Sequence, residues 1–163
     1  MCGIFGIVNI CNSENIIKEL LIHLKYLQHR GKDSYGFSYY KNNEIKVVKN
    51  LGLIKKYRKT DKNIRSCIGQ VRYTTSGNSM VDFDEKEIQP IVDNNNNIGI
   101  VHNGNIPNIN IHDTTYLLYK ISKYLQNGVK IEEALIQIIE TIPAAYSVIF
   151  QYNNQIFVCM DML

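Results

Sequence analysis

Apolar segments paired around Asn-Asn dipeptides constrain the fold of this chain more than any other feature. Residues 37–41 and 45–49 flank Asn42-Asn43, and residues 145–152 and 155–159 flank Asn153-Asn154. Short runs rich in β-branched and aromatic residues, separated by a tight polar turn, are typical of β-hairpins. We therefore expect antiparallel strand pairs in both the N-terminal and the C-terminal half.

Further apolar runs predict additional strands. Residues 3–10 form a near-continuous apolar run, which indicates a buried strand, and residues 67–71 and 98–101 are shorter candidates. Residues 50–65 and 74–90 lack periodicity and are expected to be loops.

Three segments have the apolar spacing of helices. The first has apolar residues on one face from Ile16 to Leu27 and is expected to end at Gly31. Asn12 or Ser13 is its predicted cap, with Glu14 in its first turn. The second begins at Asp113 and ends at Gly128, and the third covers 131–142 and stops at Pro143. Strands in hairpins and helices in pairs favour an α+β fold with sheets covered by helices.

Composition narrows the possible classes of protein. The chain has 163 residues, 45% hydrophobic content and a net charge of +3, which fits one globular domain over residues 1–163. It has no apolar run long enough for a membrane helix and no signal-peptide pattern, so we expect a cytoplasmic protein that binds neither membrane nor nucleic acid. The densest basic group is interpreted as a solvated loop, formed by Lys55, Lys56, Arg58, Lys59 and Lys62.

The cysteines do not predict a metal site. Cys2, Cys11, Cys67 and Cys159 form no C-x-x-C pair and do not cluster with histidines in sequence. We interpret Cys11, Cys67 and Cys159 as buried or inert thiols.

Cys2 differs from the other cysteines because its position, second in the chain, allows a catalytic role. If Met1 is removed, Cys2 carries both a thiol nucleophile and an α-amine, whose ordinary pKa is about 7.7–8.0. Such an amine can take and return a proton near neutral pH. The alternative is a small buried thiol on the first strand, and Cys2 alone favours this alternative.

Five motifs, taken in their order along the chain, favour the nucleophile over the buried thiol as the role of Cys2. They are Met-Cys-Gly-Ile-Phe-Gly-Ile at 1–7, Leu-Gln-His-Arg-Gly-Lys-Asp-Ser-Tyr-Gly at 27–36, Gly-Gln-Val-Arg-Tyr at 69–73, His-Asn-Gly-Asn at 102–105, and Asp-Thr-Thr at 113–115. Together they resemble the glutaminase domain of class II glutamine amidotransferases, the N-terminal-nucleophile type. The second motif is worded most like that of amidophosphoribosyltransferases. The resemblance implies an αββα layered sandwich that hydrolyses glutamine through a Cys2 thioester without metal or organic cofactor.

The same resemblance assigns roles to individual residues. It implies that Cys2 is the nucleophile and that the Asn103 side chain and the Gly104 N–H form the oxyanion hole. It also implies that Arg72 binds the substrate α-carboxylate and that Asp113 binds the α-ammonium. The remaining expected site residues are Tyr73 and His102 at the substrate, and Arg30 and Gly31 as structural residues near the nucleophile.

Each assignment has an alternative from the residues alone. Asn103-Gly104 is also a strong tight-turn signal, and Asp113 is also an ordinary helix N-cap. Arg72 is also compatible with a plain surface cation. The expected loop 73–84 resembles the segment that closes over glutamine in this family.

Some positions depart from the family pattern. Gln70 stands where the family usually has His, Thr115 stands where many relatives have an acid, and Cys159-Met160 replaces the usual Ala-Arg. The domain also looks shortened at its C-terminal end, and no phosphoribosyltransferase domain follows in this sequence. We therefore expect ammonia to pass to a separate acceptor domain or subunit, with self-association as another possibility. The competing hypotheses are a degenerate module that binds without turnover, and a different N-terminal-Cys amide hydrolase.

Overall fold

The computed structural model describes residues 2–10, 15–59, 62–73, 85–142 and 144–160. Its first sheet contains β1 (Gly3–Val8), β2 (Ser34–Lys41), β3 (Glu44–Leu51) and β4 (Ser66–Arg72). Its second sheet contains β5 (Ile91–Asp93), β6 (Ile98–Asn105), β7 (Ala145–Tyr152) and β8 (Gln155–Met160). The helices are α1 (Ile16–Tyr26), α2 (Asp113–Gln126) and α3 (Ile131–Thr141), with short 3₁₀ turns η1 (Gln28–Arg30) and η3 (Glu85–Glu87).

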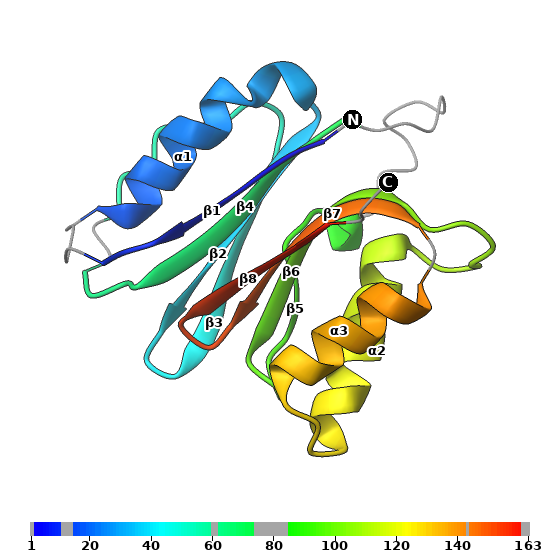
Figure 1. The fold of residues 1–163 in the computed structure, drawn as a ribbon. Coiled ribbons are helices and arrows are strands. Elements are labelled where there is room, and N and C mark those ends of the chain that lie inside the picture. The colour runs from blue at the N-terminus through cyan, green and yellow to red at the C-terminus, as the bar shows by residue number, and fades with distance from the viewer. Residues whose placement is uncertain (1, 11–14, 60–61, 74–84, 143, 161–163) are drawn as a thin grey trace.

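The elements form four layers (Figure 1). The strand order is β1-β4-β2-β3 in one sheet and β5-β6-β7-β8 in the other, and every recorded pairing is antiparallel. Helix α1 covers the outer face of the first sheet, while α2 and α3 cover the outer face of the second (Figure 1). The expected α+β αββα sandwich is confirmed.

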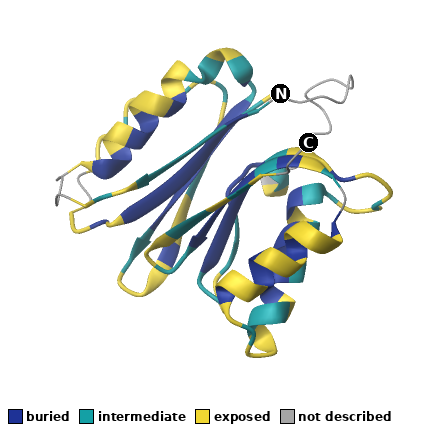
Figure 2. Ribbon diagram, in the orientation of Figure 1, coloured by how far each residue is buried: buried dark blue, intermediate teal, exposed yellow. Residues whose placement is uncertain are grey.

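Burial follows these layers (Figure 2). One apolar cluster packs α1 on the first sheet around Leu20, Leu24 and Phe37, and a second packs α2 and α3 on the other sheet around Leu117 and Phe150. A small apolar cluster of Ile68, Val101 and Ile149 lies between the sheets. The sheets are thereby held face to face, with the outer helix faces exposed.

A polar contact also joins the sheets. Ser38 Oγ donates to Gln151 Oε1 at 2.7 Å, and Gln151 Nε2 donates to the Ser66 carbonyl and hydroxyl oxygens at 2.9 Å. All three residues are fully buried. Buried amides need such partners, so these bonds fix how one sheet lies on the other.

The hairpins are confirmed, and their turns have a local cause. Asn42 and Asn43 adopt φ of 54° and 62°, and Asn153 adopts 52°. Asn tolerates this left-handed region better than most residues, so Asn-Asn suits the two-residue turns.

Several predicted boundaries were wrong. The run at 3–10 was expected to be a buried strand, but β1 ends at Val8 and is mostly half-buried because it lies at a sheet edge. The first helix ends at Tyr26 instead of Gly31, since a 3₁₀ turn follows. Cys67 is buried as expected, whereas Cys159 is only half-buried.

The largest correction concerns residues 102–105. The strand was expected to cover 98–101, with Asn103-Gly104 as a tight-turn signal after it. Instead, β6 continues through 102–105, with His102 opposite Val148 and Asn105 opposite Ala145. Pairing with β7 overrides the local turn signal of Asn103-Gly104.

Some expectations concern residues outside the described part of the chain. These are Met1, the thiol of Cys11, the predicted caps Asn12 and Ser13, the first-turn Glu14, Pro143, and nearly all of the loop at 73–84. Within the described residues, no helix is long and apolar enough to cross a membrane.

Candidate active site

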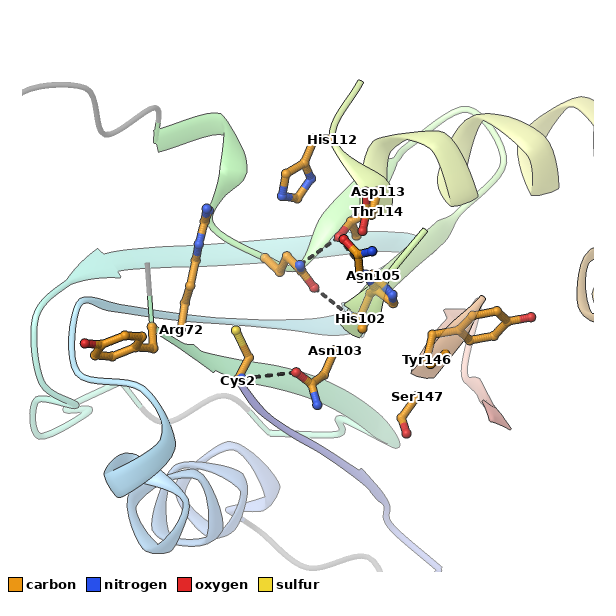
Figure 3. A pocket seen from close by; sticks show the side chains of 14 residues that line it. Cys2, Arg72, His102, Asn103, Asn105, His112, Asp113, Thr114, Tyr146 and Ser147 are labelled. Atoms are coloured by element: carbon orange, nitrogen blue, oxygen red, sulfur yellow. Dashed lines mark hydrogen bonds between the residues drawn. The ribbon is translucent and has the colours of Figure 1, made fainter. Parts of the chain in front are cut away.

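A cavity of about 640 Å³ lies at one end of the two sheets and is lined by both. Cys2 directly precedes β1, and the pairing of Gly3 with Val71 brings it beside Arg72, the last residue of β4. Asn103 and Gly104 reach the same cavity from β6, and Asp113 from the start of α2 (Figure 3). The structure thus places the residues that were expected to share a pocket around one cavity.

Cys2 is held through its backbone. Its N–H donates to Asn103 Oδ1 at 3.1 Å (Figure 3). Its carbonyl oxygen accepts a bond from Arg30 Nε at 3.2 Å. The first contact joins the two sheets at the cavity. It also orients the Asn103 side-chain amide. The amide oxygen faces Cys2 N, and the Nδ2 donors therefore point to the opposite side of the amide.

The peptide groups of β6 explain the direction of the Gly104 amide. His102 N donates to the side-chain Oε1 of Gln89 at 2.6 Å, so this N–H points away from β7. In an antiparallel strand, the N–H groups of residues two apart point the same way. The Gly104 N–H therefore also faces away from β7, beyond the point where the pairing with β5 ends at Ile100.

Gly104 itself is required by close packing. A Cβ at this position would lie 2.5 Å from the Ala145 carbonyl oxygen and 2.6 Å from Tyr146 Cα. Any side chain would push β6 and β7 apart at the cavity.

Two glutamines hold the backbone of His102. Gln70 Nε2 donates to the His102 carbonyl oxygen at 2.8 Å, while Gln89 accepts from the His102 N–H. Both side chains are buried. They occupy the side of β6 on which a strand would otherwise pair, just before Asn103.

The ring of His102 is neutral at physiological pH. Burial lowers its pKa to about 4, although the nearby Asp113 carboxylate acts in the opposite direction. Gln89 Nε2 donates to Thr114 Oγ1 at 2.7 Å, so the Thr114 hydroxyl can donate to His102 Nδ1, 3.5 Å away.

Asp113 is the first residue of α2, one position after the N-cap His112. Its Oδ2 accepts the Ile106 N–H at 2.9 Å, which closes the connection from β6 to the helix. A carboxylate at this point is favoured by the helix N-terminus. The expected N-cap position was thus off by one residue, and Asp113 still lines the cavity.

Arg72 lies at the edge of the cavity with its guanidinium on Glu87. Nη1 donates to the Glu87 carbonyl oxygen at 2.8 Å, and Nη2 contacts Glu87 Oε2 at 2.5 Å. Tyr73 follows on the lining and is 53% exposed.

Comparison with known proteins finds sequence relatives for most of the chain. No protein-family model matches the chain. Amidophosphoribosyltransferase from Staphylococcus aureus (strain MRSA252) is 36% identical over 114 residues, which cover 66% of this chain and 22% of that protein. Glutamine–fructose-6-phosphate aminotransferase (isomerizing) from Sulfolobus acidocaldarius is 27% identical over 168 residues, which cover 91% of this chain and 28% of that protein.

The fold agrees with these sequence relatives. Glutamine phosphoribosylpyrophosphate amidotransferase from B. subtilis, solved with ADP and GMP, superposes with a TM-score of 0.72 at 21% identity and covers 97% of this chain. In sequence and fold, the chain is similar to the glutaminase domain of class II amidotransferases. It covers 37% of that solved chain, so the domain corresponds to a minority of each relative's length.

The structure shows where Gln70 and Thr115, two departures from the family pattern, lie relative to the cavity. Gln70 is fully buried and uses its amide to hold β6, which requires no titration. Thr115 is exposed and does not line the cavity, where Thr114 lies instead. Neither departure therefore removes a polar group from the cavity wall.

Arg30 and Gly31 support the cavity through the residues Cys2 and Arg72. Arg30 bonds the Cys2 carbonyl, and a Cβ on Gly31 would lie 2.6 Å from the Arg72 nitrogen, so this glycine lets η1 approach the end of β4. In the described part of the chain, no cluster of His, Cys, Asp or Glu could hold a metal ion.

Sequence reasoning missed several residues of the cavity. Gln89, His112 and Thr114 approach it from the segments around β5 and α2, and Ala145, Tyr146 and Ser147 line it from β7. The β7 residues could have been found only if β6 had been extended, because they pair with 103–105. No local pattern marks Gln89.

Proposed function

We propose that this domain hydrolyses glutamine to glutamate and ammonia, with Cys2 as the nucleophile. The observation that carries the proposal is the 3.1 Å contact between Cys2 N and Asn103 Oδ1, inside a cavity that Arg72 and Asp113 also line. A thiol, an amide donor, a cation and an anion around one cavity match the groups of glutamine.

The base in this proposal is the α-amine of Cys2, released when Met1 is removed. Asn103 Oδ1 would then accept from the amine as it now accepts from the peptide N–H. An amine with a pKa near 8 can take the thiol proton and later deliver it to the leaving group. His102 is unsuited to this task because burial lowers its pKa to about 4.

Substrate recognition rests on the charges at the two sides of the cavity. Arg72 would bind the α-carboxylate and Asp113 the α-ammonium, with Tyr73 and His102 completing the wall. These groups select an amino-acid end, which argues against a different amide substrate. The side-chain amide of glutamine would then lie toward Cys2.

Two donors would stabilise the oxyanion. The Asn103 Nδ2 group and the Gly104 N–H both lie at the end of β6 next to Cys2, and preorganised donors of this kind usually supply the largest catalytic term. Gln70 and Gln89 keep this strand in place.

The reaction then has two halves. The Cys2 sulfur attacks the amide carbon, the C–N bond breaks, and ammonia leaves with the proton held by the α-amine. Water next attacks the thioester, its proton passes to the amine, and the C–S bond breaks to give glutamate and free Cys2.

We further propose that the ammonia passes to an acceptor on another domain or subunit. The names of the relatives support a sugar-phosphate acceptor of the phosphoribosyl or fructose-6-phosphate type. A second solved neighbour, which superposes with a TM-score of 0.77 at 22% identity, is the allosteric regulatory enzyme of purine biosynthesis.

The test is glutamate formation from glutamine. Purified protein should release glutamate, Cys2→Ala should abolish the release, and Cys159→Ala should leave it unchanged as a matched thiol control. Intact-mass analysis should show that active protein lacks Met1. Full activity in Cys2→Ala, or full activity with Met1 retained, would refute the mechanism; binding without turnover would favour the degenerate-module hypothesis.

A further inference from the structure

The guanidinium of Arg72 already binds a carboxylate of the same chain. The carboxylate belongs to Glu87 in η3, fifteen residues further along the chain. Arg72 Nη2 donates to Glu87 Oε2 at 2.5 Å, and Arg72 Nη1 donates to the Glu87 backbone carbonyl oxygen at 2.8 Å. One residue thus engages both terminal nitrogens of the group that faces the cavity.

The two contacts differ in how easily they can be exchanged. The Arg72 side chain is 14% exposed, whereas the Glu87 side chain is 42% exposed, so water can take over the Glu87 carboxylate. The contact to the Glu87 carbonyl belongs to the backbone and can remain. Arg72 would then keep its position while a different carboxylate occupies Nη2.

We propose that Glu87 is an internal competitor for Arg72, which an amino-acid ligand must displace with its own α-carboxylate. This inference deepens the proposed function and rests on the proposed role of Arg72 in binding glutamine. Glu87 therefore sets the affinity of the site for carboxylate-bearing ligands and leaves the chemistry at Cys2 unchanged.

The exchange is chemically symmetrical. An incoming carboxylate replaces a carboxylate, so the ligand gains only the difference between two similar charged hydrogen bonds. A partly exposed ion pair contributes little, and removing the competitor should tighten ligand binding by about two- to fivefold.

The main experiment measures binding in a Cys2→Ala background, where turnover does not interfere. Calorimetric titration with glutamine is compared for the Cys2→Ala protein and for the same protein with Glu87→Gln or Glu140→Gln. Glu140 is exposed on α3 and does not line the cavity, so Glu140→Gln matches the change in net charge. We expect a two- to fivefold lower Kd for glutamine in Glu87→Gln alone.

A second ligand separates the carboxylate from the rest of the substrate. The probe 4-aminobutanamide is glutamine without its α-carboxylate, and Glu87→Gln should not tighten its binding. An unchanged or higher Kd for glutamine in Glu87→Gln would overturn the proposal, as would equal tightening of both ligands.

A third measurement does not depend on glutamine. Phenylglyoxal reacts with accessible guanidinium groups, and its rate of addition at Arg72 should rise in Glu87→Gln and stay unchanged in Glu140→Gln. If glutamine binds to none of the proteins, the proposed function fails, while the Arg72 rate still decides the role of Glu87. If Glu87→Gln does not fold, Glu87→Asp, which shortens the reach to Arg72, is measured in the same way.

Discussion

Replacing Gln89 offers the sharpest test of how β6, which carries the proposed oxyanion-hole donors, is held in position. Gln89→Leu keeps the volume but removes the acceptor of the His102 N–H and the donor to Thr114, at 2.6 and 2.7 Å. The site is buried, with Gln89 at 5% exposure, so water cannot easily replace these partners. Because the pairing of β5 with β6 stops at Ile91 and Ile100, none of the described strand residues can take over the His102 N–H.

The magnitude follows from the orphaned donor. Leaving one buried polar group without a partner costs about 1–3 kcal/mol of unfolding free energy. For a domain of this size each kcal/mol lowers the melting temperature by roughly 2–4 °C, so we expect a decrease of about 2–12 °C. A small misplacement of Asn103 and Gly104 should also lower kcat by about 10- to 100-fold, with little change in KM.

The assay pairs thermal unfolding with glutamine hydrolysis, and Gln151→Leu is its control. Gln151 is also a buried glutamine with several hydrogen bonds, but it lies between the sheets and does not line the cavity. Gln151→Leu should lower the melting temperature while leaving kcat per folded molecule near that of the unmodified protein. Equal kcat in the two variants, or an unchanged melting temperature in Gln89→Leu, would refute the reasoning.

Other perturbations test the remaining parts of the site. Asn103→Ala should lower kcat by about 10²–10³ with KM nearly unchanged, and an equal rise in KM would contradict the oxyanion role. Arg72→Ala should slow labelling of Cys2 by a glutamine-shaped electrophile by about one to two orders of magnitude, since a charged hydrogen bond is lost. Labelling by iodoacetamide should change little, and equal slowing of both reagents would defeat the assignment. Burial lowers the pKa of His102 from 6.5 to about 4, so the unfolded chain takes up a proton that the folded protein refuses. Stability should therefore fall as the pH drops from about 6.5 to about 4, and His102→Gln should reduce this slope in acid-unfolding curves. The pKa of His112 is also lowered by burial, so the slope should not vanish completely in this variant.

The sequence predicted the hairpins and the layered fold because their signals are local. Asn42 and Asn43 supply the left-handed turn directly, and the helical spacing of apolar residues marks the faces that cover the sheets. The same reliance on local signals failed at Asn103-Gly104, where distant pairing with Ala145 and Tyr146 extends a strand through a turn dipeptide.

Only part of the candidate site could be predicted from the sequence. The order of motifs predicted that Cys2, Arg72 and Asn103 share a cavity, because they resemble a known arrangement. Glu87 and Gln89 carried no signal, since their importance comes from contacts with residues 15 and 13 positions away, respectively. Such contacts depend on how the segment before β5 folds back, which no periodicity encodes.

The packing at Gly104 determines how mutagenesis of this site must be interpreted. Position 104 will tolerate no side chain, because even a methyl group meets the Ala145 carbonyl oxygen at 2.5 Å. A substitution screen will therefore score this position as indispensable for steric reasons, whether or not its N–H touches the substrate. Replacing the Gly104 amide by an ester through chemical synthesis removes the donor without adding an atom to the crowded side. The difference between the ester and an alanine variant then separates the contribution of the hydrogen bond from the displacement of β7.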